Sequence, residues 1–306
     1  MQTFTRYWLY PTLLIWTITC MAAAVLHPDH LSQIAALKGA VTVGTLLLFE
    51  WQAPLDPRWR MTWPHLVRRD LPMLAVNGAF LAGLNVLLVV LAMETTTADG
   101  LLSRQSVVVQ VVVGLLVFEA LQYSVHRAMH GNSGPVSRFL WRCHAVHHLP
   151  QQLYVVMHAV FHPVNALIVR VFVQLTPIWV LGFDPLAVLI YGWIIALQGT
   201  VSHLNVDMRL GWLNYLVVGP ELHRYHHSAR SAEAMNYGAA LSVFDLLFGT
   251  FRYTPDRQPD RLGLYEQDGY PGQHAPLQAL VFPFTRRYSN TGSGGRSNRT
   301  RPQGVP

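Results

Sequence analysis

Long apolar runs separated by short polar segments occupy the first two thirds of the chain. Residues 7–26 form an uncharged apolar run of about twenty residues, which is the length a helix needs to cross a hydrocarbon core ~30 Å thick. The same pattern predicts membrane helices over residues 34–49, 71–93, 106–125, 153–183 and 185–201. The run at 34–49 is the weakest, because it is short and contains Lys38. We therefore expect an all-α fold, a polytopic membrane helical bundle of about six spans.

The composition supports a membrane protein and disfavours several other classes. Hydrophobic residues make up 51% of the chain and charged residues 12%, about half the share of ~25% that is usual in soluble domains. The arginines are scattered around apolar blocks without forming a basic stripe, so we expect no nucleic-acid partner despite the net charge of +6. Cys20 and Cys143 lie far apart without a CxxC motif, which argues against a disulfide framework or a thiolate zinc site.

The distribution of arginine predicts the orientation in the membrane, because positive residues in short loops stay on the cytoplasmic side. The loops at 27–33 and 183–185 carry no arginine or lysine, and Arg104 in the loop at 94–105 is offset by two acidic residues. The arginines of the other loops are Arg6, Arg58, Arg60, Arg68, Arg69, Arg127, Arg138 and Arg142. We therefore expect residues 126–152 and the chain from 203 onward to share the cytoplasmic side of a bacterial inner membrane.

The chain contains fifteen histidines, which is an unusually large number for a membrane protein and indicates a chemical role. Most fall in clusters with helical spacing: HRAMH at 126–130, HAVHH at 144–148, HAVFH at 158–162 and HRYHH at 223–227. Residues at i, i+3 and i+4 share a helix face, so each HxxHH motif is expected to direct up to three imidazoles toward one point. The candidate metal ligands are His126, His130, His144, His147, His148, His162, His203, His223, His226 and His227.

The other histidines are weaker candidates. His158 and His162 form a lone pair near the start of a membrane helix, where such residues can also cap, hydrogen-bond or line a cavity. His162 is kept as a candidate ligand and His158 is left open. The unclustered residues His27, His30, His65 and His274 are expected in loops or at the surface.

Imidazole suits iron, zinc and copper, and eight or more converging rings are more than one ion can bind, so the clusters predict two metal ions. The chain lacks the HExxH motif of metalloproteases. Carboxylates are expected outside the ligand set, where they would accept the second ring N–H of a histidine. Glu119, seven residues before His126, is such a candidate, or alternatively a polar packing residue. The other candidates are Asp207, Glu221 and Asp245.

The motif order resembles the fatty acid hydroxylase / sterol desaturase superfamily over about residues 105–254. The resemblance rests on HRAMH, HAVHH, an apolar hairpin, SHLN, LGWLNYLVVGPELHRYHHS, NYG and FDLLFGTF. It implies a cytosol-facing cap in which these histidines hold two iron ions that activate O2. Two positions depart from the family pattern. Asn165 stands where a glutamate often follows the HP element, and Phe244-Asp245-Leu246 replaces the usual Trp-Asp-Arg.

The resemblance implies an O2-dependent oxidoreductase acting on a lipid such as a sterol, a fatty acyl chain or a lipid head group. Hydroxylation is favoured over desaturation. The alternative is a histidine-rich membrane metal transporter or metal-binding protein without oxygenase activity. Asn165, Arg170 and Gln174 interrupt the apolar hairpin, where they either contact a lipid head group or form interhelical hydrogen bonds.

The chain contains neither a haem-binding HPGG segment nor a cysteine-ligated iron–sulfur motif. We therefore expect a separate electron donor, of ferredoxin or cytochrome type. The arginines that could dock it, or contact anionic lipid instead, include Arg138, Arg142, Arg224 and Arg230.

Four regions follow from these patterns. Residues 1–104 are expected to hold N-terminal membrane helices and loops, and residues 105–254 the di-iron domain. Residues 255–288 form a C-terminal extension. Residues 289–306, rich in Gly, Ser, Asn, Arg and Pro, are expected to be a disordered tail.

Overall fold

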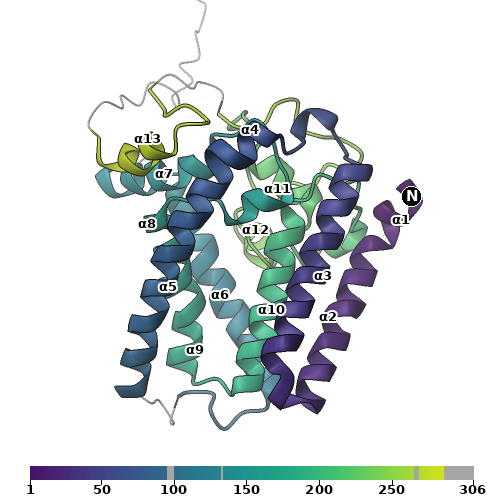
Figure 1. Cartoon of the computed structure of the whole chain (residues 1–306), viewed down its shortest axis with the longest axis vertical. Coiled ribbons are helices and arrows are strands. Elements are labelled where there is room, and N and C mark those ends of the chain that lie inside the picture. The colour runs from purple at the N-terminus through teal and green to yellow at the C-terminus, as the bar shows by residue number, and fades with distance from the viewer. Residues whose placement is uncertain (95–99, 132–133, 265–268, 286–306) are drawn as a thin grey trace, which may run out of the picture.

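The computed structural model describes residues 1–94, 100–131, 134–264 and 269–285, with the side chains of 85–94 left out. Within these ranges the chain forms helices and turns, with isolated β-bridges and no strand. Long helices run side by side, and shorter helices cover one end of the bundle (Figure 1). The predicted all-α membrane bundle is confirmed. The predicted disordered tail at 289–306 lies outside the described residues.

Five helical segments among the described residues are long and apolar enough to cross a membrane. They are α2 (Leu9–Leu26), the segment of η1 and α3 (Pro28–Gln52), α6 (Val107–Met129), the segment of α8, η5 and α9 (Pro163–Leu181) and α10 (Pro185–Ser202). A further long helix, α5 (Leu71–Glu94), coincides with the predicted span at 71–93. The protein is therefore an integral membrane protein.

The predicted span at 153–183 is wrong at its start, because the helix begins only at Pro163. Proline favours the first position of a helix, where its missing N–H is not needed. His162 precedes it in an extended conformation, and its ring accepts a hydrogen bond from the Val164 N–H. Residues 153–162 instead cross the end of the bundle and contain the short helix η4 (Val155–Ala159).

Two apolar cores hold the membrane helices in place. In one, Leu13 of α2 and Leu46 of α3 pack with Val201 of α10, and the Tyr10 hydroxyl bonds the Gln198 side chain at 2.9 Å. In the other, Phe118 of α6 packs edge-on against Tyr191 of α10, with ring centroids 6.0 Å apart. These contacts fix the ends of α6 and α10 beneath the short helices.

A cap of short elements covers one end of the bundle, where the N-terminus also lies (Figure 1). The N-terminal helix α1 (Gln2–Tyr7) is tied to the cap by Arg6, which pairs with Asp207 at 2.7 Å. The elements of the cap are η2 (Pro57–Trp59), α4 (Trp63–His65), η3 (Leu66–Asp70), α7 (Gly134–His148), η6 (Gly211–Tyr215), α11 (Pro220–His226), α12 (Val243–Leu247), α13 (Pro276–Val281) and η7 (Phe282–Phe284).

Candidate metal centre

Nine of the ten histidines predicted as ligands gather in the cap in two groups. Within each group one ring nitrogen from every member lies within 4.8 Å of the others. The first histidine group consists of His126, His130, His144, His148 and His226. The second histidine group consists of His147, His203, His223 and His227. Each group offers enough ligands for one metal ion, so the cap could hold two.

The nine histidines lie at the C-terminal ends of four helices. His130, His203 and His227 are the C-cap residues of α6, α10 and α11, and α7 ends at His148. The last carbonyls of a helix carry partial negative charge, which favours a cation at that end. The helix ends therefore bring both the ring nitrogens and a favourable backbone field to the same place.

The two HxxHH motifs are shared between the groups, which corrects the expectation that each motif serves one point. In the first motif, His144 and His148 join the first group, whereas His147 joins the second. In the second motif the division is reversed, since His226 joins the first group while His223 and His227 join the second. Helices α7 and α11 thus contribute to both groups and tie the two sites together.

In the first group, the Nε2 atoms of His126 and His144 face each other, and their hydrogen bonds leave no proton between them. The Nδ1 atom of His126 bonds the Tyr237 carbonyl at 2.8 Å, and that of His144 bonds the Asn165 side-chain oxygen at 3.0 Å. Each Nδ1 therefore carries the proton, and each Nε2 presents a lone pair. The two Nε2 atoms are 3.0 Å apart. Two lone pairs at this distance repel unless a cation lies beside them.

The second group repeats this arrangement. The Nδ1 atom of His147 bonds the Val160 carbonyl at 3.1 Å, and that of His203 bonds the Gly199 carbonyl at 3.2 Å. Their Nε2 atoms are 3.0 Å apart, and the Nε2 of His223 lies 3.1 Å from that of His203. Backbone carbonyls that hold Nδ1–H and aim Nε2 at a metal are a regular feature of histidine metal sites. The donor set fits a metal ion in each group.

Burial keeps these rings in the neutral form that binds metals. Removal from water lowers the pKa of the histidines well below its ordinary value of 6.5, because the charged form is poorly solvated there. The neighbouring histidines lower it further. This applies to His130, His144, His147, His148, His203, His223, His226 and His227.

The two groups lie next to each other. The rings of His148, in the first group, and His227, in the second, stack with centroids 4.4 Å apart. Those of His226, in the first group, and His223, in the second, are 5.1 Å apart. Two metals bound here would be neighbours that can act on the same small molecule.

Among the described hydrogen bonds, Glu119 has no histidine ring as a partner, whereas the sequence predicted that its carboxylate would accept a ring N–H. It is fully buried, and its carboxylate accepts hydrogen bonds from the N–H groups of residues 239, 240 and 241 at 2.7, 2.9 and 2.8 Å. Asp245 holds the same loop, since it accepts from the N–H groups of Tyr237 and Gly238, each at 2.8 Å. The Tyr237 carbonyl in turn holds His126. Both carboxylates thus hold the loop that carries the Tyr237 carbonyl.

Gly238 shows how tightly this loop is held. A Cβ at this position would lie 2.5 Å from the Leu241 carbonyl oxygen and 2.9 Å from an Asp245 carboxylate oxygen. No side chain fits there, which explains the glycine of the NYG motif.

The other two predicted carboxylates lie elsewhere in the cap. Glu221 accepts from the Leu210 N–H and the Asn214 side chain, each at 2.7 Å, and so anchors α11 to the preceding segment. Asp207 pairs with Arg6 and Arg209. Among the described hydrogen bonds, neither carboxylate touches a ring of the two groups.

Asn165 forms a hydrogen bond with the ring of His144, a role that the sequence analysis did not predict. The sequence left it between a head-group contact and an interhelical hydrogen bond, and the structure places it on His144. The HP element offered a signal, because Asn165 occupies the position where a carboxylate often stands in the family. An amide oxygen there performs the task of an outer carboxylate without a charge.

His162, also predicted as a ligand, lies outside both groups. Its Nδ1 accepts from the Val164 N–H at 3.1 Å, and its Nε2 bonds the Leu280 carbonyl at 3.0 Å. Both ring nitrogens are therefore engaged in capping α8 and holding the C-terminal segment.

We expect His162→Asn to retain the full metal content, because asparagine caps helices well and no ring nitrogen of His162 faces a metal. Elemental analysis of the purified variant, compared with the unmodified protein, measures this directly. Loss of one metal ion per chain would return His162 to the ligand set.

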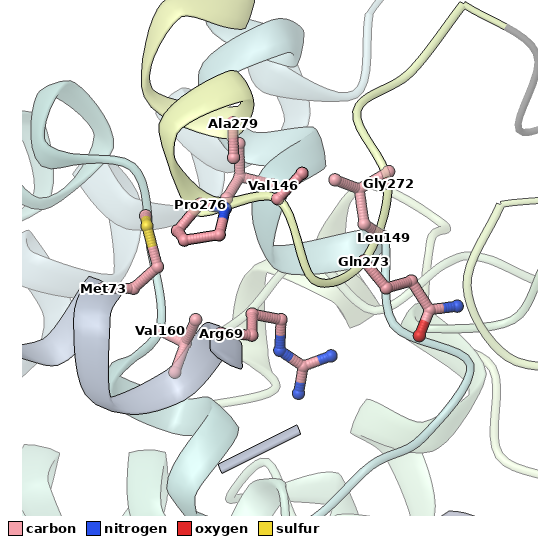
Figure 2. Close-up of a pocket in the computed structure, with 10 residues that line it drawn as sticks. Arg69, Met73, Val146, Leu149, Val160, Gly272, Gln273, Pro276 and Ala279 are labelled. Carbon is pink, nitrogen blue, oxygen red and sulfur yellow. The ribbon is translucent and has the colours of Figure 1, made fainter. Parts of the chain in front are cut away.

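A small pocket lies between Met73 of α5, Val146 of α7 and Pro276 of α13 (Figure 2). Val146 and Val160 line it next to His147, and residues 272–279 cover it. The polar side chain of Arg69 in its wall pairs with Asp70 at 2.7 Å and also bonds Tyr154. The pocket therefore has no unbalanced charge for a ligand, and it shows instead that the C-terminal segment packs directly on α7.

Fold and site together define the class of protein. It is an integral membrane protein whose helical cap carries two adjacent groups of neutral histidines suited to metal ions.

Comparisons with known proteins identify the family. A family model described as fatty acid hydroxylase matches residues 111–250. The chain is 33% identical over 262 residues to the ornithine lipid hydroxylase OlsE of Rhizobium tropici, an alignment that covers 80% of this chain and 74% of the relative. No solved structure matches the chain significantly. The chain belongs to the fatty acid hydroxylase family, and it is an enzyme of the lipid hydroxylase class.

Proposed function

We propose that the protein is a di-iron, O2-dependent enzyme that hydroxylates a C–H bond of a lipid. The observation that carries the proposal is the pairing of Nε2 lone pairs at 3.0 Å in both histidine groups. All nine histidines are proposed as ligands, with the first group on one iron and the second group on the other. The groups lie at helix ends rather than at the midplane of the spans, which favours an enzyme over a metal transporter.

Two iron ions would supply the O2 chemistry that removes hydrogen from an unactivated C–H bond, which no side chain can do alone. The overall reaction converts a C–H bond, O2, two electrons and two protons into a C–OH group and water. The chain contributes a fixed set of neutral imidazoles, held by the carbonyls of Tyr237, Val160 and Gly199. Its apolar spans give the lipid access from the bilayer.

The electrons are proposed to come from a separate ferredoxin or cytochrome that docks on the cap. Arg138 is exposed there and suits an acidic partner, whereas Arg230 is exposed but pairs with Asp260 at 2.9 Å. Arg224 is not available for docking, because it is buried and donates to the Val206 carbonyl at 2.7 Å. The arginine distribution supports a cytoplasmic position of the cap in a bacterial inner membrane.

An ornithine lipid is the first substrate to test, because the relative OlsE is named for it. The purified protein, loaded with iron and supplied with an electron donor, is expected to convert an ornithine lipid to a product heavier by one oxygen atom. With ¹⁸O2 the added atom should be ¹⁸O.

Each alternative gives a different mass-spectrometric or metal-binding result. Loss of two hydrogens would indicate desaturation. A product that carries oxygen from water would contradict the O2-dependent step. Metal transport across vesicles without O2 consumption would overturn the proposal in favour of the transporter.

A further inference from the structure

Arg170 is a charged residue inside a membrane-spanning segment, Pro163–Leu181. A guanidinium within a span is costly unless something compensates its charge, and such residues commonly mark a functional site. Arg170 is half-buried. Among the residues that the structure describes, no carboxylate forms an ion pair with it.

The hydrogen bonding of Arg170 leaves most of its donors for another partner. One NH group donates to the Gln174 side-chain oxygen at 2.8 Å. A guanidinium has five N–H donors in a planar fork that matches a carboxylate or phosphate. The neutral amide of Gln174 orients the fork without balancing its charge.

The helix that carries Arg170 is wound differently from its neighbours. Residues Ile168–Leu175 form a π-helix, a rare geometry that occurs frequently at functional sites. Arg170 follows by five residues Asn165, which lies in the preceding helix α8 and bonds His144 of the first histidine group. The distance along the helix axis between the two residues is ~7 Å.

The neighbours of Arg170 face the interior of the bundle. Gln174 accepts a hydrogen bond from the Tyr191 hydroxyl through its backbone carbonyl at 3.0 Å. Tyr191 is fully buried and packs against Phe118 of α6. Arg170 therefore lies by the interior where η5, α6 and α10 meet, below the metal centre.

We propose that Arg170 binds the anionic group of the lipid substrate, a carboxylate or a phosphate, from within the bilayer. The inference rests on the proposed function, because it assigns a lipid to the same centre. An anion held by Arg170, ~7 Å along the helix axis from the residue that bonds His144, keeps its adjacent carbons close to the first histidine group. The reaction is then directed to carbons near the anionic group rather than to the far end of an acyl chain.

The test measures lipid binding by the intact, metal-loaded protein without turnover. Three probes are compared by native mass spectrometry: oleate, which carries a carboxylate, dioleoyl phosphatidate, which carries a phosphate, and neutral dioleoylglycerol. We expect the unmodified protein to bind at least one anionic probe about ten-fold more tightly than the neutral one. The probe that is preferred identifies the anionic group.

Arg170→Gln should lose the preference for the anionic probe, and Arg170→Lys should keep part of it, because lysine retains the charge without the fork. Arg104→Gln is the matched control, since Arg104 is exposed in the loop before α6. It should bind as the unmodified protein does. Metal content is measured on each sample to show that the cap is intact. If Arg170→Gln loses metal, the comparison of Arg170→Lys with the unmodified protein decides.

Two results would overturn the inference: no preference in the unmodified protein, or an undiminished preference in Arg170→Gln. Binding is measured without O2 or electrons, so its outcome is separate from that of hydroxylation. Anion-selective binding through Arg170 without any oxidised product would contradict the proposed function alone. Hydroxylation by a protein whose binding ignores Arg170 would contradict this inference alone.

Discussion

We expect His226→Ala and His147→Ala each to lose one of the two proposed metal ions and to reduce hydroxylation by more than about 100-fold. The estimate is a lower bound, because substitutions of residues that only support a ligand already cost 10- to 100-fold in metal affinity or activity. Each alanine removes an Nε2 donor from a buried site that water reaches poorly. His226 serves the first histidine group and His147 serves the second, although both occupy the middle histidine of an HxxHH motif.

Double variants test the division between the groups more sharply than single ones. His147→Ala combined with His203→Ala damages only the second group, so one metal ion per chain should remain. His147→Ala combined with His226→Ala damages both groups and should leave none. Metal per chain is measured by elemental analysis, and activity by conversion of lipid under O2.

The control is His30→Ala, since His30 is exposed in η1, away from both groups. It should keep both metals and full activity. Retention of one metal by the double variant of His147 and His226 would show that these two histidines serve the same ion. Equal metal loss in the two double variants would likewise contradict the division.

The sequence predicted the nine histidines that converge, together with His162, which does not, but it did not predict how the nine divide into two groups. Helical spacing correctly placed His144, His147 and His148 at one helix end. The division depends on the angle at which α7 and α11 meet, which is set by packing between segments far apart in the chain. Spacing within one helix contains no information about that angle.

The role of Glu119 shows a similar limit. Its position seven residues before His126 correctly indicated the same helix face. Two helical turns correspond to about 10 Å along the axis, which is too far for a carboxylate to reach the ring. The loop that fills the gap, residues 237–241, is distant in sequence. Its presence there follows only from the folded chain.

The boundaries of the spans were predictable where a capping residue or a proline stands at the edge of an apolar run. The tight turn before Pro185 was visible, because Asp184 caps the Leu186 N–H and Pro185 begins α10. At 153–162 the residues are apolar but lie in the cap, where Tyr154 is buried beside Arg69 and Asp70. An apolar segment buried in a cap has the same composition as one in lipid, so hydropathy alone extended the span too far.

We expect Glu119→Gln and Asp245→Asn to weaken the metal affinity of the first histidine group by about 10- to 100-fold while leaving the second group unchanged. The two carboxylate oxygens of Asp245 accept hydrogen bonds from the N–H groups of Tyr237 and Gly238. In Asp245→Asn an NH2 group replaces one of these oxygens, so one backbone N–H faces a second donor. In Glu119→Gln the side-chain NH2 group likewise lies opposite a backbone N–H of the loop, which loses its acceptor. The loop shifts, and the Tyr237 carbonyl no longer fixes the Nδ1–H of His126.

A general loss of stability would not distinguish between the two groups, so the second group serves as an internal reference. Chelator competition on the purified variants measures the two affinities separately. Glu221→Gln is the matched control: Glu221 is a buried carboxylate that also accepts a backbone N–H, from Leu210, but it does not touch the 237–241 loop. It should lower the thermal midpoint without selectively weakening the first group.

Glu119 and Asp245 hold one loop, so their effects should not add. The double variant is expected to lose little more affinity than the worse single variant, because either substitution already releases Tyr237. Additive losses would mean that the two carboxylates act on the first group by separate routes. Equal weakening of both groups would mean that they support the cap as a whole, and the loop would then have no specific part in positioning His126.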